Sequence, residues 1–300
     1  MQTYIYDHYG YIVDDDYAKA FTYRGYDFKL ESHDKNEMEL SSLRELVRDI
    51  NRTLFQEGVD IIENTMGLLG CVEESSSISL VGVKKFKVTI NDLNRMHKEY
   101  LTIGDKSYSS TLLETKILWE TKIDLIENTI LPSFDKSMEY YNLIYSVISY
   151  AIGLAENALT YLNDIIIDYG SDVRKVTIAH KRLYSLNSFD LLNPFNLVLD
   201  SPMRDIAELY KNDALNNADL IKEIEKYRID TKEAMILFSR ILFPNNLFDL
   251  LEDYYIEKRR IEEEIITYYY HINKKMKEIS SLHQFLINNF GIRPIEWLIY

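Results

Sequence analysis

The spacing of hydrophobic positions changes at about residue 88, from short runs to the three-and-four spacing of helices. Before that point, two segments rich in aromatic residues flank Arg24-Gly25. This pair is typical of a tight hairpin turn, because glycine tolerates positive φ. One stretch of helical spacing and several short apolar runs follow. We therefore predict a small α+β lobe over residues 1–88, with a helix at 36–57 and strands at 18–23, 26–31, 61–62, 66–72 and 78–83.

Helical spacing continues from residue 89 to residue 300. Asn91 is a candidate N-cap for a helix that begins at Asp92. No glycine lies between Gly170 and Gly291, so this stretch can hold few tight turns. We predict a larger helical lobe with long helices at 111–131, 140–168, 204–227, 231–243 and 247–288. Apolar residues of the last helix alternate at steps of four and three, which is typical of a coiled-coil seam or of a long helix packed across its own domain.

Composition and charge narrow the class of protein. With 46% hydrophobic and 27% charged residues the chain can bury a core, which excludes wholesale disorder. A net charge of 34 − 48 = −14 disfavours nucleic acid and anionic lipid as partners, because their phosphates would be repelled. Cys71 is alone, so neither an intramolecular disulfide nor a thiolate metal cluster can form. The first residues show no secretory signal and no apolar run reaches the ~18–20 residues of a membrane span, so we expect an intracellular protein.

Motifs that cradle phosphates or carry hydrolytic nucleophiles are missing: GxGxxG, GxxxxGK[ST], GxSxG and HExxH. Among the histidines His180 stands out, because it ends a short apolar run and opens a basic turn (TIAHKRL, 177–183). Asp200 ends the next apolar run, before Ser201-Pro202. A carboxylate at the end of a buried strand can face a cleft and hold a divalent ion. Proline at the first position of a helix favours the other interpretation, in which Asp200 caps that helix, and both stay open.

Several segments in a fixed order carry a resemblance to a known family: Tyr9-Gly10-Tyr11, Tyr26-Asp27-Phe28-Lys29, GLAENALTYL (153–162), TIAHKRL, SPMRDIAELYK (201–211), ILFPNNLFDLLEDYY (241–255) and FGIRPIEWL (290–298). Together they resemble the kinase-like spore coat-associated proteins of endospore-forming Firmicutes. The resemblance implies an α+β, two-lobed, protein-kinase-like fold of the aminoglycoside phosphotransferase type. It also implies a small antiparallel-sheet N-lobe, a large mostly helical C-lobe and a nucleotide site in the cleft between them.

The resemblance assigns the phosphate and metal positions of a kinase to this chain. Lys29 matches the strand lysine that contacts the α- and β-phosphates of ATP. Its partner acid on the following helix is Glu37, Glu39 or Glu45, which the sequence does not distinguish. Asn187 and Asp200 match the two Mg²⁺ ligands, so ATP and Mg²⁺ are the implied cofactors.

The resemblance also assigns the catalytic loop. His180 matches the loop histidine, and Asp205 matches an aspartate at a helix start that braces the loop. The catalytic aspartate is replaced by Arg182, which cannot accept a proton at physiological pH. The glycine-rich loop over the phosphates is also missing, with only Gly25 at the first hairpin. Arg182 could instead pair with Asp200 and close the cleft.

Three functional hypotheses follow. The leading one is a catalytically impaired kinase-like protein with a structural or regulatory role, by resemblance in the spore coat and with other coat or scaffold proteins as partners. The second is an active ATP-dependent phosphotransferase that acts on small molecules, with Asp200 and an unrecognised base. The third is a helical scaffold without a nucleotide site, based on the C-terminal heptads. The substrate and the oligomeric state are not predicted by the sequence.

Overall fold

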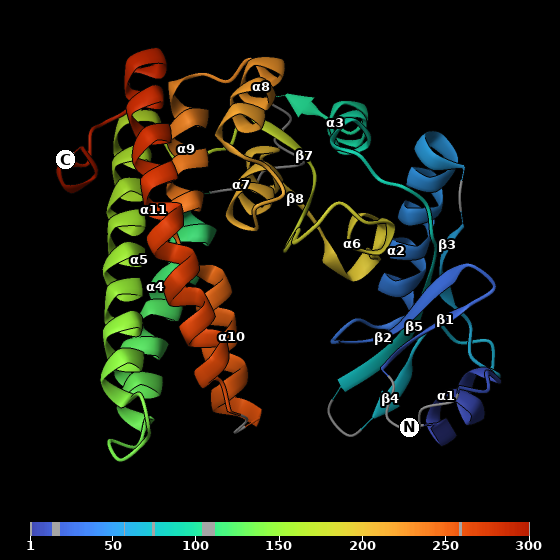
Figure 1. Cartoon of the computed structure of the whole chain (residues 1–300). Helices are drawn as coiled ribbons and strands as arrows, with labels where there is room; N and C mark the ends of the chain where they lie inside the picture. The colour runs from blue at the N-terminus through green and yellow to red at the C-terminus, as the bar shows by residue number, and fades with distance from the viewer. Residues whose placement is uncertain are drawn as a thin grey trace. The chain divides into compact units, whose positions relative to one another are not determined.

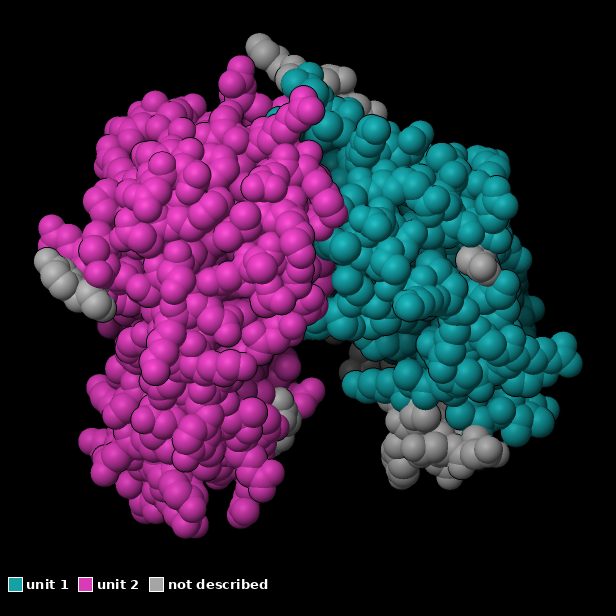
Figure 2. Space-filling model, turned by 45° about the horizontal axis from the view of Figure 1, so that its top comes forward, with its two compact units in different colours: residues 1–103, 175–205 teal, residues 104–174, 206–300 magenta. Residues whose placement is uncertain are grey.

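The computed structural model describes residues 2–13, 19–56, 58–73, 76–103, 112–257 and 260–299. They form two compact units, coloured separately in Figure 2. The first unit comprises residues 1–103 and 175–205, and the second comprises residues 104–174 and 206–300. Each unit therefore contains segments that lie far apart in the sequence.

The first unit is built on an antiparallel sheet in which β2 and β5 form the centre (Figure 1). The strand order is β1-β2-β5-β3, and β4 also pairs with β5. The predicted hairpin turn at Arg24-Gly25 joins β1 and β2, and Arg24 adopts positive φ as well as Gly25. The described strands of this sheet are β1 (Ala20–Tyr23), β2 (Tyr26–His33), β3 (Val59–Ile62), β4 (Cys71–Glu73) and β5 (Ser76–Lys84), and the helix α1 (Gln2–Tyr9) precedes them.

The predicted helix of this lobe is α2 (Glu37–Ile50), which continues as one wider turn, Asn51–Phe55. It begins with a capping box: the Asn36 side chain accepts from the backbone of Glu39 at 3.0 Å, and the Glu39 carboxylate accepts from the backbone of Asn36 at 2.8 Å. Leu40, Val47 and Ile50 are buried, and the helix packs beside β3. The antiparallel sheet with one main helix agrees with the predicted fold class.

The next helix, α3 (Ile90–Glu99), corrects one sequence-based cap. The cap is Thr89 rather than Asn91, because the Asp92 carboxylate accepts from both the backbone N–H and the hydroxyl of Thr89, at 2.9 and 2.7 Å. The helix therefore begins two residues earlier than a cap at Asn91 would place it.

A small second sheet belongs to the first unit, although the predicted boundary at residue 88 assigns it to the helical lobe. It contains β6 (Thr102–Ile103), β7 (Lys175–His180) and β8 (Leu197–Asp200) in antiparallel order, with the short helix α6 (Ser188–Leu192) between β7 and β8. The association has a physical cause, since α3 packs against β7 and α6 lies beside β5. The division of the chain therefore differs from the predicted 1–88 and 89–300.

The second unit is helical, and the chain enters its last part through α7 (Met203–Lys211), which begins in the first unit. Its other described helices are α4 (Leu112–Leu125), α5 (Tyr141–Tyr169), α8 (Asn217–Tyr227), α9 (Thr231–Leu242), α10 (Asn245–Glu257) and α11 (Glu262–Phe290). The predicted helix 204–227 is thus two helices. Asp213 adopts positive φ after α7, and the Asn216 side chain caps α8 at the backbone of Asp219.

The predicted helix 247–288 is likewise divided into α10 and α11, and its seam packs inside the unit. Ile265, Ile279 and Leu286 are buried on α11. The helix contacts α5 and α9, which Figure 1 shows beside it. This packing favours the interpretation of a long helix packed across its own domain over a coiled-coil seam.

By length and composition alone, two helical segments could cross a membrane: Tyr141–Tyr169 and the α9–α10 segment Thr231–Glu257. The most apolar window of the second is 83% buried inside the fold, and that of the first is 44% buried. Helices in the core of a globular unit have the same composition, so these segments are weak grounds for a membrane span.

The side chain of Lys232 caps the C-terminus of α5 and is expected to stabilise the helical unit. Its ammonium is buried and donates to the carbonyls of Tyr169, Gly170 and Asp172 at 3.1, 2.7 and 2.8 Å, closing the C-terminus of α5. We expect Lys232→Met to leave these carbonyls without a donor and to destabilise the unit by about 2 kcal/mol. Trp119, which is buried in this unit, reports its unfolding by fluorescence.

The control for this variant is Lys222→Met, because Lys222 is exposed on α8 and its described ion pair is with the nearby Asp219 on the same helix. It is expected to change the free energy of unfolding by less than about 0.5 kcal/mol. Equal effects of the two substitutions would contradict a capping role for Lys232.

Candidate functional site

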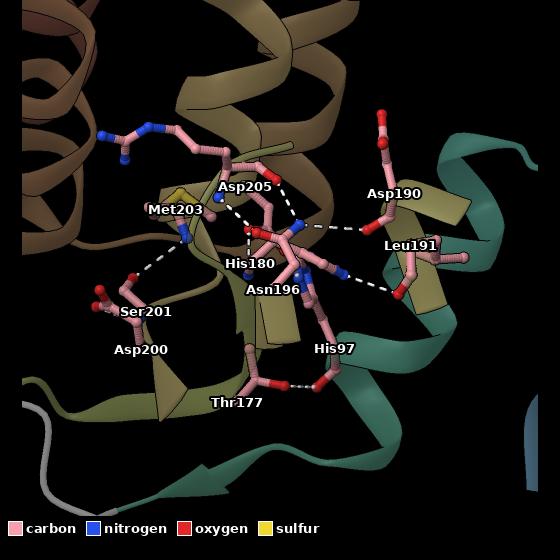
Figure 3. Close-up of polar contacts among 11 residues, drawn as sticks. His97, Thr177, His180, Asp190, Leu191, Asn196, Asp200, Ser201, Met203 and Asp205 are labelled. Atoms are coloured by element: carbon pink, nitrogen blue, oxygen red, sulfur yellow. Dashed lines mark hydrogen bonds and ion pairs between the residues drawn. The ribbon is translucent and has the colours of Figure 1, made fainter. Parts of the chain in front are cut away.

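A buried polar cluster around Asp205 holds the start of the loop that follows β7 (Figure 3). One oxygen of Asp205 accepts from the backbone N–H of His180 at 2.8 Å. The other lies 2.7 Å from Nδ1 of His180 and 2.9 Å from Nε2 of His97 on α3. The opposite ring nitrogen of His180 lies 2.9 Å from the carbonyl of Leu191. Asp205 thus joins β7, α3 and the first turn of α7.

The hydrogen bonds define the charge of this cluster. The Leu191 carbonyl and an ionised Asp205 carboxylate can only accept, so this geometry favours hydrogen on both ring nitrogens of His180, that is, an imidazolium. Burial by itself would lower the pKa of His180, but the charge of Asp205 and these hydrogen bonds raise it overall. Burial would raise the pKa of Asp205, but the imidazolium and the donated hydrogen bonds hold it well below its usual range.

Lys29 lies on β2 with its side chain about half exposed, and its partner is not an acid of α2. Its ammonium pairs with Glu31 on the same strand at 2.9 Å and lies 5.9 Å from the ring centroid of Phe189. Glu31 also accepts from the side chain of Asn193 at 2.9 Å. The expectation of a pair with one of three helix acids is therefore corrected: Glu37 accepts from the backbone of Leu69, Glu39 caps α2, and no described contact joins either of them or Glu45 to Lys29.

Asn187 occupies the N-cap of α6. Its side-chain oxygen accepts from the backbone N–H of Asp190 at 2.8 Å. Its amide donates to Ser185 and to the Asp190 carboxylate at 2.7 and 2.8 Å. The side-chain oxygen of Asn187 that would bind a metal ion therefore caps the first turn of α6 instead.

Asp200 is 3% exposed at the end of β8, and both of its carboxylate oxygens have partners in the fold. One accepts from the backbone N–H of Ser201 at 2.6 Å, and the other pairs with Arg204 at 2.8 Å. Ser201 supplies the side chain that accepts from the backbone of Met203 at the start of α7. The described partners of the Asp200 carboxylate are thus a backbone N–H and a guanidinium, and its two interpretations stay predictions.

Arg182 lies two residues after His180, at the position that the resemblance assigns to the catalytic aspartate. Asn196 accepts from its backbone N–H at 3.0 Å and donates to its carbonyl at 2.6 Å, so the loop backbone is fixed. The Arg182 guanidinium donates to the carbonyl of Lys181 at 2.9 Å. A cation described on Asp200 is Arg204, which also reaches the carbonyl of Lys181 at 3.2 Å, and the pairing of Arg182 with Asp200 stays a prediction.

Two neighbouring cavities lie between β2 and the β7–β8 segment, and Lys29 and Asp190 line both. The first has a volume of about 210 Å³ and includes Glu31 and Arg182. The second has a volume of about 390 Å³ and includes Asp27 and Asn187. The structure thus brings Lys29, Arg182 and Asn187 to one region, whereas Asp200 lines neither cavity.

This arrangement does not fit a nucleotide with its metal ion well. Mg²⁺ requires several oxygen ligands at short distance, and the oxygens of Asp200 and Asn187 are already bonded within the fold. Among the described residues no three His, Cys, Asp or Glu side chains are grouped to hold a metal ion. Lys29 is the best placed phosphate contact, but Glu31 neutralises it.

Sequence reasoning missed three residues of this region: Glu31, His97 and Arg204. Glu31 and Arg204 had a readable signal, because positions i+2 on a strand and i+4 toward a helix lie beside Lys29 and Asp200. His97 had none, since its contact with Asp205 joins positions 108 residues apart.

Comparison with known proteins extends these findings. The fold is similar to the crystal structure of an aminoglycoside phosphotransferase from Alicyclobacillus acidocaldarius, with a TM-score of 0.55 over 90% of this chain and 93% of the other, at 9% identity. An endospore coat-associated protein YutH of Bacillus subtilis (strain 168) is 29% identical over 175 residues. That match covers 50% of each chain, so this chain spans about half the length of its curated relative in the alignment.

The family comparison covers far more of the sequence. The model described as "Spore coat putative kinase YutH" matches residues 2–288, which include the β2 lysine, the loop after β7 and most of the helical unit. With its two-part α+β structure of the aminoglycoside phosphotransferase type, the chain belongs to the YutH family of spore coat putative kinases.

Proposed function

We propose that this protein is a catalytically impaired kinase-like protein, a pseudokinase, with a structural or regulatory role in the spore coat. The observation that carries the proposal is Arg182 in the catalytic-loop position, two residues after His180. A hydroxyl acceptor of phosphate needs a group that orients or deprotonates it, and a guanidinium does neither. Loss of such a base typically lowers the rate by about 10²–10⁴-fold.

The phosphate and metal positions support the same conclusion independently. Arg204 places a permanent cation 2.8 Å from the Asp200 carboxylate, where a kinase would hold Mg²⁺. Lys29 forms its ion pair with Glu31 on its own strand, whereas a kinase positions this lysine toward the phosphates through an acid on the following helix, here α2. Three features of the ordinary phosphotransfer site are therefore altered together.

A place in the spore coat is supported by the family and by the name of the Bacillus subtilis relative, an endospore coat-associated protein. In this role the partners would be other coat or scaffold proteins. The net charge of −14 disfavours nucleic acid and anionic membrane surfaces, and we propose neither a nucleic-acid partner nor a membrane span.

One observation favours a second candidate, an active ATP-dependent phosphotransferase for small molecules. Asp190 lines both cavities beside Lys29 and offers a carboxylate that could act as a base in place of the missing aspartate. Its Oδ2 accepts from Ser185 and Asn187, at 3.0 and 2.8 Å. A helical scaffold without any nucleotide site is the third class.

The test compares turnover of ATP by the wild type with that of Asp200→Ala and Asp190→Asn. A pseudokinase predicts that all three release phosphate at the same background rate, with Mg²⁺ or Mn²⁺ present. Robust wild-type turnover that disappears in Asp190→Asn would instead establish the phosphotransferase. Thermal unfolding with and without ATP separates both from the scaffold class, because a ligand that binds the native state raises stability.

The structural role needs a separate measurement in spores. A fluorescent fusion of this protein, produced in an endospore-forming host without its own homologue, is expected to concentrate at the coat. Lys29→Ala and Asp200→Ala fusions should localise equally, because the role does not depend on phosphate transfer. Failure of the wild type to reach the coat would contradict the proposed location.

A further inference from the structure

The segment after α11, residues 291–299, packs against the helical unit as a strap beside α5 (Figure 1). It buries Ile292 and Leu298, which are 2% and 4% exposed. The indole N–H of Trp297 donates to the side chain of Asn157 on α5 at 3.1 Å. The strap is therefore seated on the helices by apolar side chains and by directed hydrogen bonds.

One of these hydrogen bonds is made by a buried histidine of α11, His283. Its ring is 0% exposed and stacks on Phe238 of α9, with 4.8 Å between ring centroids. Its Nε2 accepts from the backbone N–H of Ile295 in the strap at 3.2 Å. This geometry assigns a neutral ring with its hydrogen on Nδ1, which is buried and has no hydrogen-bond partner among the described residues. The strap is thus held by the neutral form of His283.

Protonation of His283 is incompatible with this contact. An imidazolium carries hydrogen on both ring nitrogens and has no acceptor, so the N–H of Ile295 would face another N–H. The positive charge would also lie in the interior of the unit, where an unpaired charge is costly. Burial accordingly lowers the pKa of His283, and the nearby backbone of Arg293 offsets this only in part.

The charged groups around the ring offer an imidazolium little compensation. The charged residues of the strap are Arg293 and the exposed Glu296. The Arg293 guanidinium already pairs with Asp164 and Asp168 of α5, at 2.9 and 2.7 Å. Tyr161 of α5 donates to the Arg293 carbonyl at 3.0 Å, and burial raises its pKa, so this hydroxyl stays neutral. The ring contact from α9 is aromatic, and the positions one turn away on α11 are uncharged.

We propose that His283 is a pH-dependent latch: its neutral ring holds the strap on the helical unit, and its protonation at mildly acidic pH releases the strap. Release would expose Ile292, Leu298 and the apolar surface that they cover. The helical unit would then present at acidic pH a surface that is hidden at neutral pH. This device is independent of the kinase-like region and of whether phosphate is transferred.

The test follows amide hydrogen exchange of the full chain between about pH 7.5 and about pH 5, with rates corrected for the intrinsic effect of pH. Because the pKa of His283 is lowered in the closed state, the latch is fully effective above the ordinary value of about 6.5 and is lost as the pH falls through the lowered value. Protection of the Ile295, Leu298 and Ile299 amides should fall by up to about tenfold per pH unit below about 6.5, while Ile279 in α11 changes by less than about twofold. Strap protection that is constant over this range would overturn the proposal.

Two variants assign the effect to this ring. His283→Gln offers an amide oxygen that accepts from Ile295 and does not titrate, so strap protection should no longer depend on pH. His271→Gln is the matched control, because His271 also lies on α11 and its described ion pair is with Asp213. It should keep the pH dependence of the wild type. Dependence that persists in His283→Gln would assign it to the acids of α5 and overturn the proposal, as would its loss in His271→Gln.

NMR titration of the His283 ring in the wild type keeps the test decisive if His283→Gln fails to fold. The ring should titrate below about pH 6.5, over the same range in which strap protection falls. A ring that stays neutral while the strap opens, or that titrates while the strap stays closed, would overturn the latch.

Discussion

Replacing Asp205 with asparagine is expected to cost about 3–5 kcal/mol of stability in the first unit, the penalty typical of a buried charge left without its partner. Asp205 is fully buried and accepts hydrogen bonds from the backbone and ring of His180 and from the ring of His97. An asparagine keeps only one acceptor, and its amide would face ring donors. The His180 imidazolium would also lose its counter-charge.

The measurement is amide hydrogen exchange in β7, because both tryptophans, Trp119 and Trp297, lie in the other unit and report its unfolding. Exchange at Thr177, Ile178 and Ala179 should accelerate by roughly 10²- to 5 × 10³-fold, which corresponds to that free energy. Asp190→Asn is the control, since Asp190 is partly exposed and keeps an acceptor when amidated. Equal amide exchange rates in β7 of the two variants would contradict the role of Asp205 in holding His180 and the end of β7.

The effect should depend on pH in a defined direction. The folded-state pKa of His180 is raised, so its contribution is fully present below its ordinary pKa of about 6.5 and is lost as the pH rises through the folded value. The pKa of Asp205 is lowered, so its contribution is present above about 3.8 and is lost only as the pH falls through the folded value. The difference between wild type and variant should therefore be largest between these limits and narrow toward alkaline pH.

Local sequence signals predicted the elements of the fold better than their ends. Arg24-Gly25 marked a hairpin because only the local backbone decides that turn, and the helix predicted at 231–243 begins at Thr231 because Asp230 and Glu233 form a capping box. The break between α7 and α8 was missed, since Asp213 adopts positive φ without a glycine to signal it. The division into units was missed because α3 and β7 meet only through long-range packing.

The candidate site was predictable only where a resemblance supplied the roles. His180 and Asp205 were located by their motifs, and their contact follows from a strand end meeting a helix start. The described partners Glu31 of Lys29 and Arg204 of Asp200 were not predicted, because a family pattern gives positions but not the neighbouring charges. Which cation pairs with a given carboxylate depends on side-chain positions in the folded protein, and the hydrophobic pattern of the sequence does not determine these positions.

Restoring a metal site should require two substitutions, Arg182→Asp and Arg204→Ala together. The first supplies the carboxylate of an ordinary catalytic loop, and the second frees the Asp200 oxygen that Arg204 holds at 2.8 Å. With a dielectric near 20, two unit charges about 4 Å apart interact by about 4 kcal/mol, so removing a cation at that distance favours the binding of a divalent ion by up to about twice that. We expect the double variant to bind ATP at least about tenfold more tightly in Mg²⁺ than in EDTA, while the wild type differs by less than about twofold.

Isothermal titration calorimetry of both proteins with ATP, in Mg²⁺ and in EDTA, measures this difference, and Arg95→Ala controls for the loss of an exposed cation elsewhere in the unit. Adding Asp200→Ala to the double variant should abolish the metal dependence, because that carboxylate is the ligand the two substitutions release. Tight Mg²⁺-dependent binding by the wild type would contradict the argument, since it would mean that Arg204 leaves Asp200 readily. Metal dependence that persists without the Asp200 carboxylate would place the ion on other ligands and remove the reason for regarding Arg204 as its substitute.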